Sequence, residues 1–177
     1  MNIIAFAAST SKLSINKQLV AHTLTHFSES NTTLLDLNDY ELPLFSVDLE
    51  QEIGHPEAAA RFIADLAPAD LIIISMAEHN GNYTAAFKNL FDWCSRIEAT
   101  IFKDKPLFLL STSPGGYGGK NSLGAAVARF PRHGAEILET FSLPTFDTNF
   151  DPTTGITDEA LRDEFMSKIE AVKLKVN

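Results

Sequence analysis

The stretch from residue 70 to residue 93, DLIIISMAEHNGNYTAAFKNLFDW, constrains the fold of this chain more than any other. It opens with an unbroken apolar run at residues 71–74, and such a run is typical of a strand buried on both faces of a parallel sheet. A polar loop at residues 75–83 follows. Beyond the loop, apolar side chains recur at the spacing of one helix face: Phe87, Leu90, Phe91 and Cys94. Open α/β sheets bind ligands where such strands end, so this loop is the first candidate for a functional site.

The rest of the chain repeats this alternation of strands and helices. Four more apolar segments predict strands, at residues 2–7, 32–37, 106–110 and 135–143. Amphipathic segments predict further helices, at residues 15–27, 56–66, 121–133 and 157–176. Residues 40–54 show no clear period and predict a long loop. The alternation predicts a single α/β domain over residues 1–177. Five strands favour a flavodoxin-like, doubly wound parallel sheet of order 2-1-3-4-5 over the six-stranded dinucleotide-binding order.

Charge and composition exclude several classes of protein. The formal net charge is −9 and the lysines and arginines are scattered, so the chain lacks the basic face that nucleic-acid-binding proteins need. No apolar run approaches the roughly 18 residues that span a bilayer, and the N-terminus lacks the basic segment of a signal peptide. A single cysteine, Cys94, excludes an internal disulfide and fits a reducing compartment. We therefore expect a cytoplasmic protein without nucleic-acid or membrane partners, in which Cys94 is a buried, inert thiol.

The loops after the first, third and fourth predicted strands share one rim, because right-handed crossovers place them there. The first loop, residues 8–16, offers hydroxyls and backbone amides at a helix N-terminus, with Ser14 as the expected N-cap. These groups suit a phosphate, although a capped helix with solvated serines explains the same residues. Neither G-x-G-x-x-G nor G-x-x-x-x-G-K-[ST] is present, so neither a Rossmann nor a nucleoside-triphosphate site is predicted.

The other two loops carry different signals. Residues 113–119 hold four glycines, which let the backbone approach a flat ligand closely, with a flexible surface loop as the alternative. The middle loop holds Glu78 and His79, a pair that suits acid–base chemistry or half of a metal site. No second set of metal-binding side chains lies at ligand spacing, so we predict no metal site and expect His79 to form a planar wall or a hydrogen bond. The remaining histidines, His133 among them, are expected to be mostly solvated.

In chain order, these loops resemble three motifs of the NADPH-dependent FMN reductase family, which includes bacterial quinone, chromate and azo reductases. Residues 8–16, ASTSKLSIN, resemble the family's phosphate loop G-S-x-R-x-x-S-x-N. Residues 77–89 resemble its P-E-Y-N-x-x-x-x-x-x-x-K-N segment, and residues 113–119 resemble its S-x-G-x-x-G-G loop. Ala8 and Ser11 stand where the family has glycine and arginine. Loss of the arginine–phosphate contact is expected to weaken FMN binding about 10- to 100-fold, unless a nearby lysine compensates.

The resemblance implies an FMN-dependent NAD(P)H oxidoreductase that passes hydride through bound flavin to a quinone-like or other small acceptor. No side chain is expected to serve as an obligatory acid or base. Two alternatives stay open: a flavodoxin-like electron carrier with little turnover of its own, and a scaffold that no longer binds flavin. The residues implied in binding the cofactor are Ser9, Ser11, Ser14, Ile15, Asn16, Ala77, Glu78, His79, Asn80, Gly81, Ser113, Pro114, Gly115 and Gly116.

The sequence also predicts a homodimer or homotetramer. Trp93 lies off the apolar stripe of its predicted helix, and Phe45 lies in the predicted long loop, so both are expected to be exposed and to form a partner surface. Relatives in the resembled family are commonly dimers or tetramers that complete each flavin pocket across the interface. The alternative is that both aromatic side chains cap the core.

Overall fold

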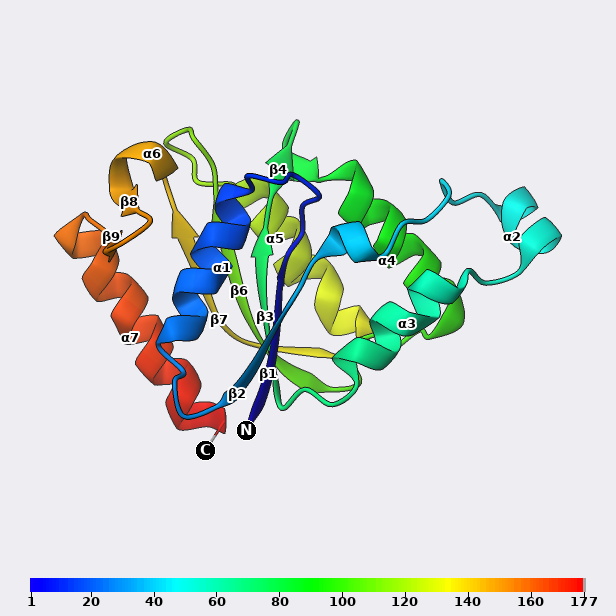
Figure 1. Ribbon diagram of the computed structural model, residues 1–177, viewed down its shortest axis with the longest axis horizontal. Coiled ribbons are helices and arrows are strands. Elements are labelled where there is room, and N and C mark those ends of the chain that lie inside the picture. Colours follow the sequence, from blue (N-terminus) through cyan, green and yellow to red (C-terminus); the bar gives the residue numbers. More distant parts are fainter. Residues whose placement is uncertain (177) are drawn as a thin grey trace.

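A five-stranded parallel sheet forms the centre of the molecule in the computed structural model, which describes residues 1–176 (Figure 1). The strands are β1 (Asn2–Ala7), β2 (Asn31–Leu35), β3 (Leu71–Met76), β6 (Lys105–Thr112) and β7 (Ala135–Leu143). Their order in the sheet is β2-β1-β3-β6-β7, which is the predicted order 2-1-3-4-5. Every residue of β3 is buried, as expected for a central strand with helices on both faces. The predicted fold class is confirmed.

Helices cover both faces of the sheet and enclose two hydrophobic cores. On one face lie α3 (Glu57–Leu66), α4 (Ala85–Ile97) and α5 (Lys120–Arg129), and on the other lie α1 (Ile15–Thr25) and α7 (Glu159–Val176). The remaining elements are short: η1 (Leu37–Asp39), α2 (Val47–Ile53), β4 (Glu78–His79), β5 (Asn82–Tyr83), η2 (Phe130–His133), α6 (Phe146–Asn149), β8 (Phe150–Asp151) and β9 (Gly155–Ile156). No helix in the described range combines the length and apolarity needed to cross a bilayer.

Residues 40–54, predicted as a long loop, contain a helix that stands away from the body of the molecule (Figure 1). The Ser46 hydroxyl caps α2 by accepting a hydrogen bond from the Leu49 N–H at 3.1 Å, and the helix ends at Gly54, where φ is 71°. No residue of α2 is buried. The loop prediction was wrong here, because a helix of seven residues has too few turns for an apolar period to show in the sequence.

The expectation that Trp93 is exposed was also wrong, because its side chain is fully buried. Its Nε1 donates a hydrogen bond to the Pro43 carbonyl at 2.8 Å, and its ring lies edge-on to Phe45 with the ring centres 5.0 Å apart. Beside it, the Asn89 Oδ1 accepts a hydrogen bond from the Phe45 N–H at 2.8 Å. The chain after η1 therefore folds over α4 and buries a side chain that helical spacing alone places outside the core.

Two further buried side chains bear on reactivity. Cys94 is fully buried, as predicted, and burial raises the pKa of its thiol to about 12, so very little of the reactive thiolate is present at neutral pH. The remaining histidines were expected to be mostly solvated, but His133 is buried, and its Nδ1 donates a hydrogen bond to the Ala99 carbonyl at 2.8 Å. This bond ties η2 to the segment after α4, so His133 has a structural role.

Candidate functional site

The loops that follow β1, β3 and β6 meet at one edge of the sheet, around a pocket of about 260 Å³. Figure 1 shows the three loops together at the top of the view. The pocket is lined by Ser9, Ser11, Leu13, Ser14, Ile15, Asn16, Ala77, Glu78, His79, Thr112, Ser113 and Pro114. The carboxyl ends of parallel strands share one edge of a sheet, and ligands bind in the crevice outside that edge. The pocket is therefore the first candidate for a binding site.

All but four of the predicted cofactor-binding residues line this pocket. The four others lie farther along the same loops: Asn80, Gly81, Gly115 and Gly116. The structure adds two residues that were not predicted, Leu13 of the first loop and Thr112, the last residue of β6. No sequence signal separates Thr112 from the rest of its strand, so only the folded chain reveals its place in the pocket.

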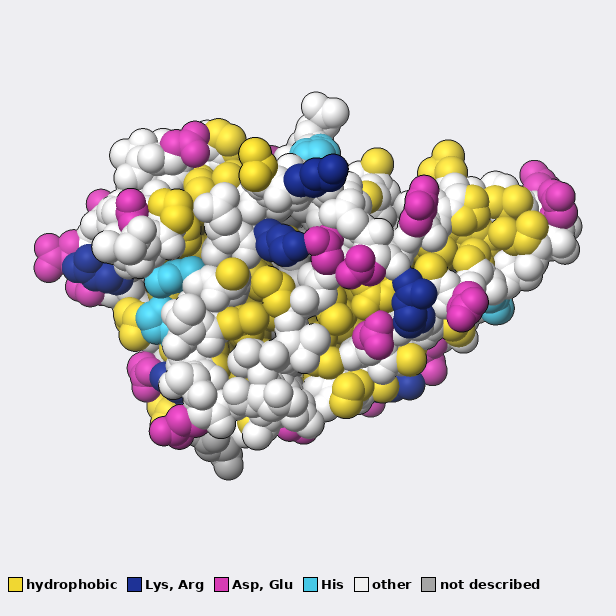
Figure 2. All heavy atoms as spheres, viewed as in Figure 1, with side chains coloured by type: hydrophobic (Ala, Val, Ile, Leu, Met, Phe, Trp, Pro, Cys, Tyr) yellow, Lys and Arg dark blue, Asp and Glu magenta, His cyan; other side chains and the backbone are white. Residues whose placement is uncertain are grey.

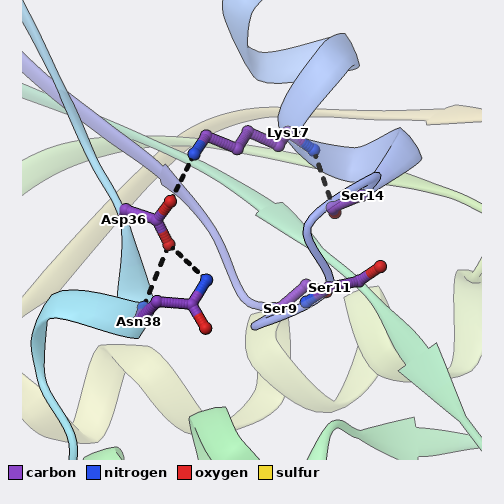
Figure 3. Close-up of polar contacts among 6 residues, drawn as sticks. All are labelled: Ser9, Ser11, Ser14, Lys17, Asp36 and Asn38. Carbon is purple, nitrogen blue, oxygen red and sulfur yellow. Dashed lines mark hydrogen bonds and ion pairs between the residues drawn. The ribbon is translucent and has the colours of Figure 1, made fainter.

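The first loop presents hydroxyl and amide donors to the pocket. Ser14 caps α1, as predicted, by accepting a hydrogen bond from the N–H three residues later at 3.2 Å (Figure 3). The Ser9 Oγ accepts a hydrogen bond from the Ser11 N–H at 3.2 Å, and a hydroxyl that accepts one bond still has its own proton to donate. Ile15 and Asn16 are the first two residues of α1, so their N–H groups have no intrahelical acceptor. With the positive end of the helix dipole, these groups suit an anion such as phosphate.

The two lysines near this loop differ in their availability. The Lys17 Nζ lies 2.5 Å from the Asp36 carboxylate (Figure 3), and this hydrogen bond holds the pKa of Asp36 below its usual range. Lys12 is exposed, belongs to the loop itself and forms no ion pair within residues 1–176. Lys12 is therefore the basic side chain of this loop that can approach a bound anion.

The Asn16 side chain holds the three loops together. It is buried, and its Oδ1 accepts hydrogen bonds from the Ser75 hydroxyl at 2.7 Å and from the Thr112 N–H at 3.1 Å. Its Nδ2 donates to the Thr112 carbonyl at 3.1 Å. These bonds join the first turn of α1 to the ends of β3 and β6. These bonds occupy the Oδ1 and one of the two N–H groups of Nδ2, so the side chain is held by the loops, and the backbone N–H of Asn16 is available to a ligand.

The methyl group of Ala8, where the resembled family has glycine, is accommodated without strain. Residue 8 does not adopt a positive φ, so glycine is not required there. Its N–H donates to the Ser75 carbonyl at 2.9 Å, and its carbonyl accepts a hydrogen bond from the Thr84 hydroxyl at 2.8 Å. Thr84 is buried and also caps α4. Sequence reasoning missed Thr84, which fixes the first loop to α4.

The middle loop contains a β-hairpin and is not irregular. β4 and β5 pair in antiparallel fashion around Asn80 and Gly81, whose φ values are 51° and 77°. A type I′ turn requires positive φ at both central residues, and Asn-Gly is a preferred sequence for it. The Asn-Gly pair was therefore a hairpin signal that the loop prediction overlooked.

Glu78 lines the pocket, but its carboxylate serves as a helix cap. One oxygen, Oε2, accepts hydrogen bonds from the N–H groups of Asn121 at 2.9 Å and Ser122 at 3.0 Å. The other oxygen, Oε1, accepts one from the Asn121 Nδ2 at 3.1 Å. These donors belong to the first turn of α5, so Glu78 fixes the hairpin to that helix. His79 is exposed at the edge of the pocket.

Two of the four glycines in the third loop have structural roles. Gly118 and Gly119 are buried and adopt φ values of 66° and 76°. A Cβ atom on Gly118 would lie 2.4 Å from the Ser142 Oγ, and the Gly118 carbonyl accepts a hydrogen bond from that hydroxyl at 3.0 Å. The expectation that all four glycines lie open to a flat ligand was wrong for these two. The exposed glycines are Gly115 and Gly116.

Comparison with known proteins identifies related enzymes. Residues 1–148 match the family model described as NADPH-dependent FMN reductase. A quinone reductase from Escherichia coli (strain K12) is 26% identical over 183 residues, which cover 97% of this chain and 93% of that protein. A 2-hydroxy-1,4-benzoquinone reductase from Burkholderia sp is 32% identical over 119 residues, which cover 67% of this chain and 63% of that protein.

Solved structures share the fold. The flavoenzyme NAD(P)H:(acceptor) oxidoreductase FerB from Paracoccus denitrificans has a TM-score of 0.73 at 21% identity, and the match covers 98% of this chain and 97% of that one. An FMN-dependent NADH-azoreductase from Bacillus anthracis str. Ames Ancestor, solved in complex with FMN, has a TM-score of 0.66 at 17% identity and is covered completely by this chain. At these identities the likeness concerns the fold.

Proposed function

The chain belongs to the NADPH-dependent FMN reductase family and is an FMN-dependent NAD(P)H oxidoreductase of the quinone-reductase type, and we propose that its FMN binds in the pocket between the three loops. The observation that carries this proposal is that loops far apart in the sequence line one pocket with hydroxyl and amide donors. A carboxyl-edge pocket of this kind is the expected ligand site of the fold.

The residues of the pocket suit the chemistry of FMN. We place its phosphate at the N-terminus of α1, where Ser9 and Ser14 offer hydroxyls beside free helix N–H groups. Lys12 would supply a point charge in place of the arginine of the family. The flavin ring would extend toward His79 and the exposed Gly115, which leave space for a flat group.

When bound, FMN would supply the hydride-transfer chemistry that couples oxidation of NAD(P)H to reduction of the quinone. The protein binds and orients the reactants. The helix N-terminus fixes the phosphate, and the bonds of Asn16 to Ser75 and Thr112 hold the loops in place. The Glu78 carboxylate accepts hydrogen bonds from the first turn of α5, and that no side chain serves as an obligatory acid or base remains part of the proposal. The electron-carrier alternative is not favoured, because the curated relatives named above are reductases.

The kinetics should show that both substrates use one site in turn. We expect parallel double-reciprocal lines when NADH is varied at several fixed concentrations of 1,4-benzoquinone, because the nucleotide must leave before the quinone reaches the same open face. Intersecting lines would show that both substrates bind together. Failure to oxidise NADH or NADPH with excess FMN and quinone would favour the electron-carrier alternative.

We also propose that the chain forms a homodimer through an arm, residues 44–55, that includes α2. Leu44, Val47 and Ile53 are 81%, 55% and 50% exposed, and Figure 2 shows apolar side chains gathered on the projecting arm at the right of the view. The Arg96 Nε, on α4, lies 2.9 Å from the Glu50 carboxylate, on α2, and this ion pair holds the arm to α4. A fixed apolar surface of this kind is typical of a protein–protein contact, and a second copy of the chain is the partner proposed here.

Leu44→Glu should convert the dimer to a monomer, because it places a charge on the most exposed apolar side chain of the proposed contact. Light scattering at micromolar concentration should then give the 19.4 kDa mass of one chain, against about twice that mass for the unchanged protein. Leu174→Glu is the matched control, since Leu174 is 82% exposed on α7, away from the arm. A monomeric mass for the unchanged protein would contradict the proposal.

A further inference from the structure

A second cleft, of about 390 Å³, opens on the other side of the first loop. It lies between that loop, the segment from η1 to the start of the arm, and the first turns of α4. Thr10 lines this cleft, whereas its neighbours Ser9 and Ser11 line the proposed FMN pocket. The first loop is therefore a shared wall, and a molecule that extends across it can occupy both sides.

The cleft combines an apolar wall with a polar rim. Leu37, Leu42 and Leu90 form part of the wall, which suits a flat, uncharged ring. The polar side chains at the rim include Asn38 and Glu41, which follow the end of β2. The Asn38 Nδ2 donates a hydrogen bond to Asp36 at 2.8 Å, and its Oδ1 points away from that carboxylate (Figure 3).

The charge of the cleft is acidic. Glu41 is exposed and forms no ion pair within the part of the chain that the structure describes. No lysine, arginine or histidine lines the cleft. Two cations nearby have other partners: Lys17 pairs with Asp36, and the Arg61 guanidinium lies over the Tyr40 ring and donates to the Asp39 carbonyl. A third, Lys12 of the first loop, is assigned to the FMN phosphate and does not line this cleft.

We propose that this cleft binds the adenosine half of the reduced nicotinamide nucleotide and that Glu41 accepts hydrogen bonds from its ribose hydroxyls, so that the chain prefers NADH to NADPH. This inference rests on the proposed function, because the nicotinamide half must reach the FMN on the far side of the first loop. A carboxylate can accept hydrogen bonds from both hydroxyls of a ribose diol, whereas a 2′-phosphate calls for a cationic partner. Here the 2′-phosphate would meet Glu41 with no cation on the cleft wall.

The first test compares the two nucleotides in the FMN-loaded enzyme. We expect kcat/KM for NADH to exceed that for NADPH by about 10- to 100-fold, the discrimination that hydrogen bonds to a charged group supply. Glu41→Arg should reverse the preference, and Glu41→Gln should reduce it. Glu29→Arg is the matched control, since Glu29 is an exposed residue between α1 and β2 that does not line the cleft. An unchanged ratio in Glu41→Arg would overturn the inference and leave the reductase function intact.

The second test measures binding without turnover. In an NMR titration of the isotope-labelled protein, 5′-AMP should shift the backbone amide signals of Thr10, Asn38 and Glu41. Adenosine 2′,5′-bisphosphate should bind with an affinity at least about 10-fold lower. Equal or tighter binding of the bisphosphate, or shifts confined to the FMN pocket, would overturn the assignment of the cleft. This test applies even if no NAD(P)H oxidation is found, an outcome that would count against the proposed function instead.

Discussion

Ser14→Asp is expected to weaken FMN binding by more than about 100-fold, because it sets a carboxylate against the phosphate at the N-terminus of α1. The helix itself should tolerate the change, since aspartate is as good an N-cap as serine and a negative charge is favourable at that end of a helix. The Ser14 hydroxyl accepts from the Lys17 N–H, a bond that an aspartate oxygen can also accept. The measurement is a titration of the apoprotein by quenching of FMN fluorescence.

Ser46→Asp is the matched control for this substitution. Ser46 caps α2 in the same way, by accepting from the Leu49 N–H at 3.1 Å, but it lies on the arm and not in the pocket. FMN should bind Ser46→Asp as it binds the unchanged protein. Unaltered binding by Ser14→Asp would remove the phosphate from the first loop and with it the proposed cofactor site.

Asn16→Ala should lower the free energy of unfolding by roughly 2–4 kcal/mol, because it leaves buried polar groups without partners. The groups affected are the Ser75 hydroxyl and both backbone groups of Thr112, each now bonded to the Asn16 side chain. Urea denaturation of the apoprotein measures the loss and separates it from any effect of FMN.

Asn31→Ala is the control for that measurement. The Asn31 side chain donates to the Asn2 side chain at 3.2 Å, but this bond is exposed, so its loss should change the free energy of unfolding by less than about 0.5 kcal/mol. Equal losses in the two variants would show that the Asn16 bonds do not hold the loops together.

The strand order and the meeting of the three loops could be predicted from the sequence, because both depend on local patterns and on a general rule. The apolar run at residues 71–74 identifies a buried strand by itself, and the helical spacing after residue 84 identifies the helix that follows. Parallel strands then bring their carboxyl ends to one edge whatever the side chains are. Ser14 is the N-cap for an equally local reason, since its partner lies three residues away.

The roles of individual polar side chains could not be predicted, because their partners are remote in the sequence. Asn16 bonds to a residue 96 positions away, and Glu78 caps a helix 43 positions away. In the sequence, each is a polar residue in a loop that resembles a cofactor loop. Which of them faces a ligand and which supports the fold depends on which hydrogen-bond donors the folded chain brings beside them.

Trp93 and the arm show the same division between local pattern and tertiary contact. Helical spacing places Trp93 off the apolar stripe of α4 and so predicts an exposed side chain. In the folded chain, residues 42–45 cross over α4 and bury the ring. The sequence by itself determined the sheet, its order and the rim that carries the three loops, since apolar periodicity and helix caps act over a few residues. Only the tertiary structure decided that the Trp93 side chain is buried, that α2 is exposed, and that a second cleft opens beside the first loop. The reason is that burial depends on how segments from distant parts of the sequence pack together.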